Sequence, residues 1–248
     1  ITITDLASSN HDATLAKVGD TLTTNFTSSD PVTSVTIGGH AATVTQIDAT
    51  TYKATYIVKA GDTSTDVVVT SVDTAGNVTQ QPLSGQVTID TVAPTATITL
   101  SDTALKIGET STVTITFSEA VSGFSLNDLT AQNGTLTNLS QAINNGDGTF
   151  SYTATFTPNS AIENTTNVVS LSTGYTDLAG NTGNAQQSTN YTIDTLAPKA
   201  SITVNSVTAD NVINKAELDA GKVNVTGTVG GDVQSGDTVT LTVNGQTY

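Results

Sequence analysis

The feature that most constrains this chain is a phrase of six residues that occurs twice. It reads Ile-Asp-Thr-Val-Ala-Pro at residues 89–94 and Ile-Asp-Thr-Leu-Ala-Pro at residues 193–198, 104 residues later. A second phrase, Asp-x-Ala-Gly-Asn, starts at Asp73 and again at Asp177 with the same spacing. A period of about 100 residues is too long for a solenoid repeat and matches a complete small domain. The sequence therefore predicts a tandem array of domains, each with its own core.

The first predicted domain spans residues 1–89 and contains seven short segments in which apolar and polar residues alternate. These are residues 1–4, 21–26, 32–37, 41–46, 52–58, 67–72 and 86–89. Clusters of Gly, Asn, Asp and Pro separate them, and Gly38-Gly39 fits a tight hairpin because Gly takes positive φ without steric cost. About seven short strands with turns between them are typical of a β-sandwich.

The second predicted domain, residues 90–193, repeats this plan. Its expected strands are residues 95–100, 112–117, 123–126, 135–139, 149–157, 167–171 and 188–193. In the fifth of them, apolar residues share one face: Phe150, Tyr152, Ala154 and Phe156. This pattern predicts that one face of the strand is buried in the core and that the other is exposed to solvent. A partial third domain is expected at residues 194–248, with strands at 200–204, 222–228 and 238–243 and a hairpin turn at Asn244-Gly245.

No segment places apolar residues at helical spacing over three turns. We therefore predict an all-β fold of tandem immunoglobulin-like β-sandwich domains arranged end to end. The cores must be small, because hydrophobic residues make up 36% of the chain and aromatic residues 4%. There is no Cys, so disulfide bonds cannot stabilise these small domains and another device is needed.

The charge of the chain indicates what that device is. There are 22 acidic residues against 7 Lys, with no Arg, which gives a formal net charge of −15. A chain without guanidinium groups lacks the usual means of binding phosphates or bases, so no nucleic-acid partner is expected. No apolar run reaches the about 20 residues of a membrane span, so no membrane insertion is expected either. An acidic chain favours a bound cation.

These phrases resemble a known family. Domains of about 100 residues that end in Asp-x-Ala-Gly-Asn, a short strand and Ile-Asp-Thr-x-Ala-Pro resemble the bacterial Ig-like domain repeats of giant biofilm-associated and repeats-in-toxin (RTX) surface adhesins. The phrase Phe-Ser-Glu-Ala-Val at residues 117–121 is similar to another such domain. The resemblance implies a stalk on the bacterial cell surface, type I secretion, a role in cell adhesion and biofilm formation, and Ca²⁺ at many of the joints.

The direction of the chain also predicts which acids meet at a joint. In an end-to-end array the last strand of each domain runs away from the N-terminal end, so the loop before that strand lies beside the incoming linker. Asp177 and Asn181 are therefore expected near Asp90. From the preceding domain, the predicted contributors are Asp5, Asp12, Asp20, Asp62 and Asp66. Ca²⁺ takes six to eight hard oxygen ligands, and carboxylates and amides supply them, so Ca²⁺ is the predicted ion.

The same reasoning gathers a second set of acids around Asp194. Its expected members are Asp102, Glu109 and Glu163 from the second domain and Asp232 from the third. Asp73 and Asn77 would serve a joint before residue 1.

Simpler interpretations stay open. Asp-x-Ala-Gly-Asn is also the pattern of a tight loop in which Asp accepts hydrogen bonds from its own backbone. Asp90 and Asp194 could be solvated linker residues, and residues 210–217 suit a helix cap as well as a metal loop.

No enzyme is predicted. The two His residues, His11 and His40, stand near no nucleophile motif, and the few aromatic residues offer no platform for sugars. The sequence instead predicts a monomeric, extracellular, calcium-rigidified stalk segment of an adhesin, whose partners are the neighbouring Ig-like domains and, through other regions, a host or abiotic surface. The alternatives are a domain that binds a glycan or protein, and a structural array without metal.

Overall fold

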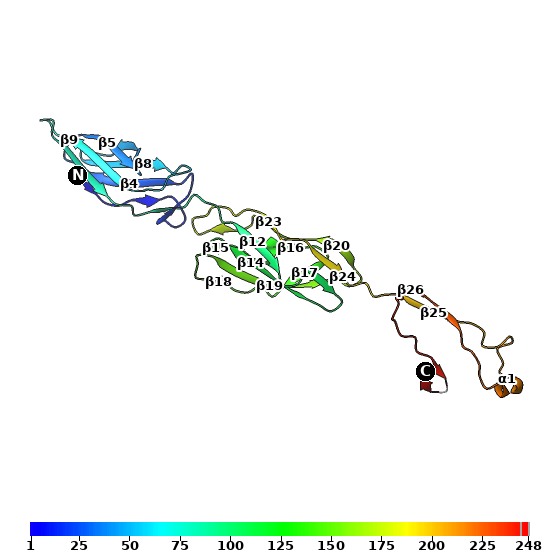
Figure 1. The fold of residues 1–248 in the computed structure, drawn as a ribbon. Helices are drawn as coiled ribbons and strands as arrows, with labels where there is room; N and C mark the ends of the chain where they lie inside the picture. The colour runs from blue at the N-terminus through cyan, green and yellow to red at the C-terminus, as the bar shows by residue number, and fades with distance from the viewer. Residues whose placement is uncertain (244, 248) are drawn as a thin grey trace.

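The computed structural model describes residues 1–243 and 245–247, without the side chain of Leu218. The hairpin turn predicted at Asn244 lies outside the described residues. Figure 1 shows two β-sandwiches that follow one another along the chain, and then a separate group of short elements near the C-terminus. The prediction of an all-β fold with tandem Ig-like sandwiches is confirmed. Within the described residues, no helix has the length and hydrophobicity that a membrane crossing requires.

The first sandwich is built from two antiparallel sheets and one short parallel pair. One sheet contains β1 (Thr2–Ile3), β2 (Ala7–Ser8), β4 (Thr21–Thr27), β7 (Thr43–Gln46) and β8 (Thr51–Ile57). The other contains β5 (Val32–Ile37), β6 (His40–Ala41), β9 (Val67–Val72) and β10 (Val78–Leu83). The parallel pair consists of β3 (Leu15–Ala16) and β11 (Thr88–Ile89).

The alternation of residue types along these strands explains the core between the sheets. In β4, the buried positions Leu22, Thr24 and Phe26 alternate with more exposed ones. Phe26 stacks on Tyr52 of the neighbouring strand, with ring centroids 5.3 Å apart. Gly38 and Gly39 have positive φ angles of 61° and 80° between β5 and β6, so the predicted hairpin is present.

The second sandwich has a larger set of short strands. One sheet contains β12 (Ala96–Leu100), β14 (Ser111–Phe117), β17 (Gly134–Thr137), β18 (Ile143–Asn144) and β19 (Phe150–Pro158). A second sheet contains β13 (Ala104–Lys106), β20 (Glu163–Asn167) and β24 (Tyr191–Asp194). A third contains β16 (Leu129–Ala131), β21 (Val169–Leu171) and β23 (Gln186–Gln187), and β15 (Val121–Ser122) pairs with β22 (Thr176–Asp177).

Aromatic residues fill the core of the second sandwich. The fully buried Phe117 has its ring centroid 4.9 Å from that of Tyr175, 5.0 Å from Phe124 and 5.7 Å from Tyr152. Edge-to-face pairs of this kind contribute beyond the area that they bury. As predicted, Ala154 and Phe156 of β19 face this core.

Several sequence predictions differ from the structure. A strand was predicted at residues 123–126, but Ser125 caps the short 3₁₀ helix η1 (Leu126–Asp128) there. β10 was missed because its residues, Val-Thr-Gln-Gln-Pro-Leu, are polar and exposed, as suits an edge strand. Of the strand predicted at 222–228, only the last two residues belong to a strand, β26 (Gly227–Gly231), which pairs with β25 (Ala200–Val204). Of the strand predicted at 238–243, the end forms β27 (Thr242–Val243), paired with β28 (Gln246–Thr247).

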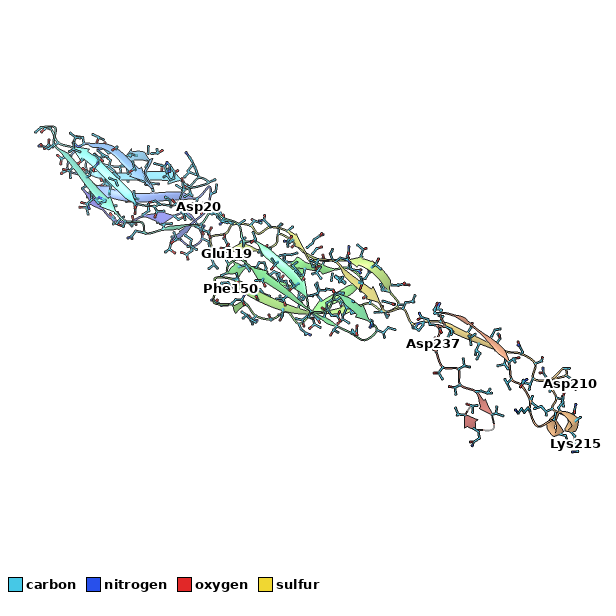
Figure 2. The ribbon with its side chains drawn as sticks, in the orientation of Figure 1. Asp20, Glu119, Phe150, Asp210, Lys215 and Asp237 are labelled. Atoms are coloured by element: carbon cyan, nitrogen blue, oxygen red, sulfur yellow. The ribbon has the colours of Figure 1, made fainter. Side chains whose placement is uncertain are left out.

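Residues 210–214 lead into a short helix; Figure 2 labels Asp210, which precedes it, and Lys215, its first residue. Asn214 caps α1 (Lys215–Asp219): its Oδ1 accepts hydrogen bonds from the backbone of Ala216 and Glu217, and the Glu217 carboxylate accepts one from the backbone of Asn214. This is a capping box, so the cap interpretation of this stretch describes the structure. The apolar residues of this part of the chain, such as Ile202 and Val229, are about half exposed, with no core around them.

Candidate metal centre

The loop that carries Asp177 folds through its own hydrogen bonds. Asp177 Oδ1 accepts a hydrogen bond from the Asn181 backbone at 2.8 Å, and Oδ2 accepts one from Asn181 Nδ2 at 2.7 Å. Asp73 makes the same two bonds with Asn77, both at 2.8 Å. The Asp-x-Ala-Gly-Asn phrase is therefore a self-supporting loop in both sandwiches, as the simpler interpretation of the sequence holds.

The second copy of this loop has an additional neighbour, the linker. Asn181 Nδ2 donates a hydrogen bond to the backbone oxygen of Asp90 at 2.9 Å. The backbone nitrogen of Asp90 donates to the oxygen of Ala16, in the first sandwich, at 2.8 Å. The amide nitrogen of Asn181 therefore holds the linker beside the loop. A role of Asn181 as a metal ligand, which would use its side-chain oxygen, stays a prediction.

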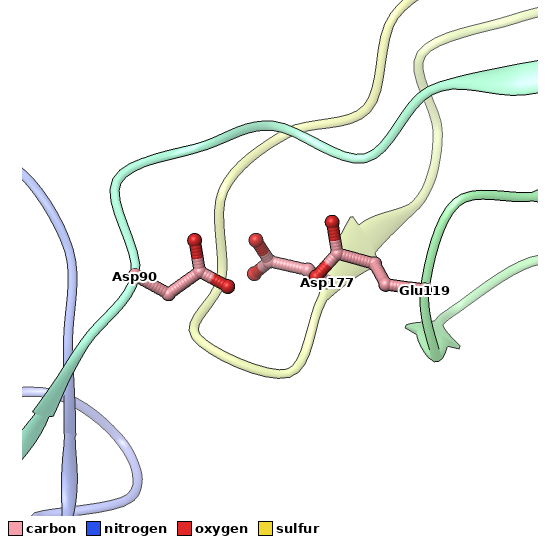
Figure 3. Close-up of side chains that lie close together, drawn as sticks. All are labelled: Asp90, Glu119 and Asp177. Atoms are coloured by element: carbon pink, nitrogen blue, oxygen red, sulfur yellow. The ribbon is translucent and has the colours of Figure 1, made fainter. Parts of the chain in front are cut away.

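Glu119 completes the cluster. It follows Phe117, the last residue of β14, and precedes β15, whose Val121 pairs with Asp177. One carboxylate oxygen from each of Asp90, Glu119 and Asp177 lies within 4.8 Å of the other two. Figure 3 shows the three carboxylates turned toward one another from the linker, the end of β14 and the loop. Asp177 is only 1% exposed, and the other two are partly buried.

Three acids in such proximity repel one another. Burial raises the pKa of Glu119, and the charges of Asp90 and Asp177 and a hydrogen bond with Asp90 raise it further. The cluster therefore has two ways to lower its energy: Glu119 can take up a proton, or a cation can bind. The donors are all hard oxygens and up to three negative charges, which suits Ca²⁺, with water and backbone oxygens completing its shell.

The other acids predicted for this joint lie outside the cluster. Asp20 accepts hydrogen bonds from Lys17 and Asn10, and Asp5 is an exposed residue between β1 and β2. Three more are engaged elsewhere in the first sandwich: Asp12 with Thr14, Asp62 with Tyr56 and Lys59, and Asp66 with Gly85. Asp73 and Asn77 lie in the first loop, away from this joint.

The second joint does not gather its acids in the same way. Asp194 is exposed, with Lys106 on one neighbouring strand and Glu163 on the other. The remaining predicted residues bind nearby backbone: Asp102 that of Ala104, Glu109 that of Lys106, and Asp232 that of Lys199. No second group of three acids this close together occurs in residues 1–243 or 245–247.

The direction of the strand that precedes Glu119 is a signal in the sequence for its place in the cluster. The strand predicted at 112–117 runs antiparallel to the one predicted at 95–100, so its last residues return to the incoming linker. An acid just after that strand therefore lies beside Asp90.

Residues 90–193 match the bacterial Ig-like domain family. Ig-like domains of this kind are usually non-enzymatic structural or binding units of extracellular surface proteins. The match includes all three acids of the cluster. No curated protein matched the sequence.

Several solved structures match the chain with low TM-scores. The full ectodomain of mouse nectin-like molecule 4 is 12% identical with a TM-score of 0.32, over 76% of this chain and 63% of that one. The Ig1-2 module of the Drosophila receptor tyrosine phosphatase DLAR is 12% identical with a TM-score of 0.25, over 78% and 100%. The fibronectin(III)-like modules of Clostridium thermocellum CbhA are 14% identical with a TM-score of 0.27, over 76% and 93%. At these TM-scores the matches carry no argument about this chain.

Proposed function

We propose that this chain is a calcium-stiffened stalk segment of a bacterial surface adhesin, and that it takes part in cell adhesion and biofilm formation. The observation that carries the proposal is the convergence of Asp90, Glu119 and Asp177 at the first joint. The match of residues 90–193 to bacterial Ig-like domains supports an extracellular location. Secretion by the type I route, a monomeric state and the absence of catalysis and of nucleic-acid partners belong to the same proposal.

A cation at this cluster would act on the linker. Asp90 is attached to the first sandwich through its backbone bond to Ala16, while its side chain points to Glu119 and Asp177 of the second Ig-like domain. A metal ion held by the three carboxylates would fix the Asp90 side chain to the second domain, while the Asp90 backbone stays bonded to the first. Three residues later, Pro94 has a fixed φ and biases Ala93 toward an extended backbone, so little freedom remains in the linker. One ion would therefore restrict the hinge without changing either core.

We expect small-angle X-ray scattering to detect this effect. Without Ca²⁺, the repulsion among the acids acts over a distance well within the screening length of about 10 Å at 0.1 M salt, so the joint should open more often. Excess chelator should lower the maximum dimension and the radius of gyration relative to excess Ca²⁺. Mg²⁺ at the same ionic strength is the control, because it demands a tighter octahedral shell. Identical curves with Ca²⁺ and chelator would contradict the proposal.

The raised pKa of Glu119 predicts that calcium binding depends on pH. Burial and the two neighbouring acids raise this pKa above its ordinary value of 4.5. In the metal-free protein, Glu119 therefore favours the folded state fully below its unfolded pKa, and this contribution is lost as pH rises through the folded pKa. Ca²⁺ must displace the same proton, so its affinity should fall as pH drops through that window.

Titration calorimetry in two buffers of different ionisation enthalpy measures the proton released for each Ca²⁺ bound. Release should be detectable in wild type near the Glu119 pKa and absent in Glu119→Gln, which cannot titrate. Equal proton release in wild type and Glu119→Gln would show that another group is responsible.

A further inference from the structure

A loop of the first sandwich reaches across the joint to the loop that carries Asp177. Asn10 Nδ2 donates hydrogen bonds to the backbone oxygen of Ala179 at 2.8 Å and to Asp20 Oδ2 at 2.7 Å. The orientation of the Asn10 amide is supported from its other side, because Oδ1 accepts a hydrogen bond from the backbone of Asp12. Both polar ends of Asn10 are therefore used, and one of its bonds joins the two domains.

Lys17 makes a second contact across the joint. Its side chain lies against Gly180, while its ammonium group is 3.2 Å from Asp20 Oδ1. Asp20 thus binds both Asn10 and Lys17, the two residues that contact the Asp177–Asn181 loop. Partial burial opposes ionisation of Asp20, but hydrogen bonds from the Lys17 backbone and the Asn10 amide, together with the Lys17 charge, lower its pKa overall. Asp20 is consequently a charged anchor at neutral pH.

A comparison of the two Asp-x-Ala-Gly-Asn loops shows what this contact does. Ala179 is 2% exposed, whereas the matching Ala75, in a loop with the same internal hydrogen bonds, is exposed. Ala179 lies where Asn10 and Lys17 of the first sandwich contact the loop, and a docked domain there accounts for its burial. The buried alanine thus reports a docked interface.

The second sandwich has no equivalent device. Ser9 and Ser101 occupy matching positions in the two sandwiches. The hydroxyl of each accepts a hydrogen bond from a backbone nitrogen near the start of the neighbouring strand, Thr21 in β4 and Thr112 in β14. Ala16 and Leu105 also match, because they pair with Ile89 and Ile193 in the same way. Six residues lie between Ser9 and Ala16, but only three lie between Ser101 and Leu105, so this loop is shorter in the second sandwich. The position of Asn10 is taken by Asp102, whose side chain ends in two oxygens and has no amide N–H group. Among the described residues, no hydrogen bond joins residues 199–247 to the second sandwich.

We propose that Asn10, Lys17 and Asp20 form a clamp that docks the Asp177–Asn181 loop against the first sandwich without any metal ion. The clamp goes beyond the proposed calcium function, because it acts in the metal-free protein. It makes the first joint ordered before calcium binds, and it leaves the second joint without the same restraint. Asn10 acts as a positioning residue for the loop that carries Asp177. The array is therefore unevenly stiff along its length.

Pulsed electron resonance between spin labels tests the clamp in excess chelator. Because the chain has no Cys, labels can be attached to single cysteines introduced at exposed strand positions, Lys53→Cys with Thr130→Cys across the first joint and Thr130→Cys with Ser201→Cys across the second. A neutral hydrogen bond of this kind favours the docked state by a factor of about 2 to 10. Asn10→Ala and Asn10→Asp should therefore broaden the first distance distribution, and His11→Ala, an exposed neighbour, should not.

The two variants separate the possible causes. Asn10→Asp keeps the size of the side chain but loses the donor, so broadening in both variants assigns the effect to the hydrogen bond. The distribution across the second joint should stay unchanged in both, and their melting temperatures should match that of His11→Ala. If the distance distributions of Asn10→Ala and Asn10→Asp across the first joint are no broader in chelator than that of His11→Ala, the clamp proposal is wrong. A failure of Ca²⁺ to narrow the wild-type distribution would instead count against the calcium proposal alone.

Discussion

Asp177→Asn is expected to weaken calcium binding at the first joint by at least about 10- to 100-fold, the loss known for removing groups that merely support metal ligands. The substitution removes one of three negative charges and the most buried of the three carboxylates. Asp73→Asn should leave the affinity unchanged, because Asp73 belongs to no group of three close acids among the described residues.

Asp73→Asn is a closely matched control. Both substitutions replace a carboxylate that accepts the same two hydrogen bonds, from the backbone and from Nδ2 of the Asn four residues later. The local cost to the loop is therefore similar, and the two variants differ in the charge that faces Asp90 and Glu119. Titration calorimetry with Ca²⁺ gives both affinities. Equal affinities for the two variants would place the ion elsewhere.

Phe117→Ala should destabilise the second Ig-like domain by about 3–5 kcal/mol, as for other buried aromatic residues truncated to alanine. Phe117 is fully buried and contacts three other aromatic rings, so its removal leaves a large cavity in a small core. This is a large part of the about 5–15 kcal/mol that stabilises an ordinary domain. Glu119 follows two residues later, so calcium binding should weaken with the fold.

Phe26→Ala is the matching change in the first sandwich, where Phe26 is 1% exposed and stacks on Tyr52. The two sandwiches have separate hydrophobic cores. Differential scanning calorimetry should therefore show one transition lowered by Phe117→Ala and a different one lowered by Phe26→Ala. If either variant lowers both transitions equally, the domains unfold as one unit and the separate-core interpretation is wrong.

The repeat carried most of what could be predicted about the fold. Strands rich in β-branched residues with a buried inner face, such as Val32–Ile37 and Val67–Val72, have the predicted bounds. β10 escaped because a polar edge strand has no inner face for the pattern to mark. α1 escaped because five residues are too few to establish a helical period. Its cap, Asn214 with Glu217, was recognised only as one of two interpretations.

The candidate site was predicted less completely, for a geometric reason. Asp90 and Asp177 lie in phrases that repeat, and the strand directions place them at one joint. Glu119 has no repeated partner: the residue that takes its position after the matching strand of the first sandwich is Ser28. The acids expected from the preceding domain are predicted to lie at the joint only because their loops lie at the end of the domain that faces it. Which of them face the gap depends on local hydrogen bonds, such as those of Asp20, that a sequence pattern does not specify.

The parallel pairing of β3 with β11, and of β13 with β24, has a mechanical consequence. In each sandwich the strand that leaves for the next domain lies beside a segment that belongs to the entering end, joined for example by the 2.8 Å bonds from Thr88 to Thr14 and from Thr192 to Thr103. Tension on the two ends of the chain pulls these parallel strands in opposite directions along their length. Their hydrogen bonds are then loaded in shear, all together, instead of opening one after another like a zipper. A cell held to a surface through such a chain would strain each sandwich along its most resistant direction.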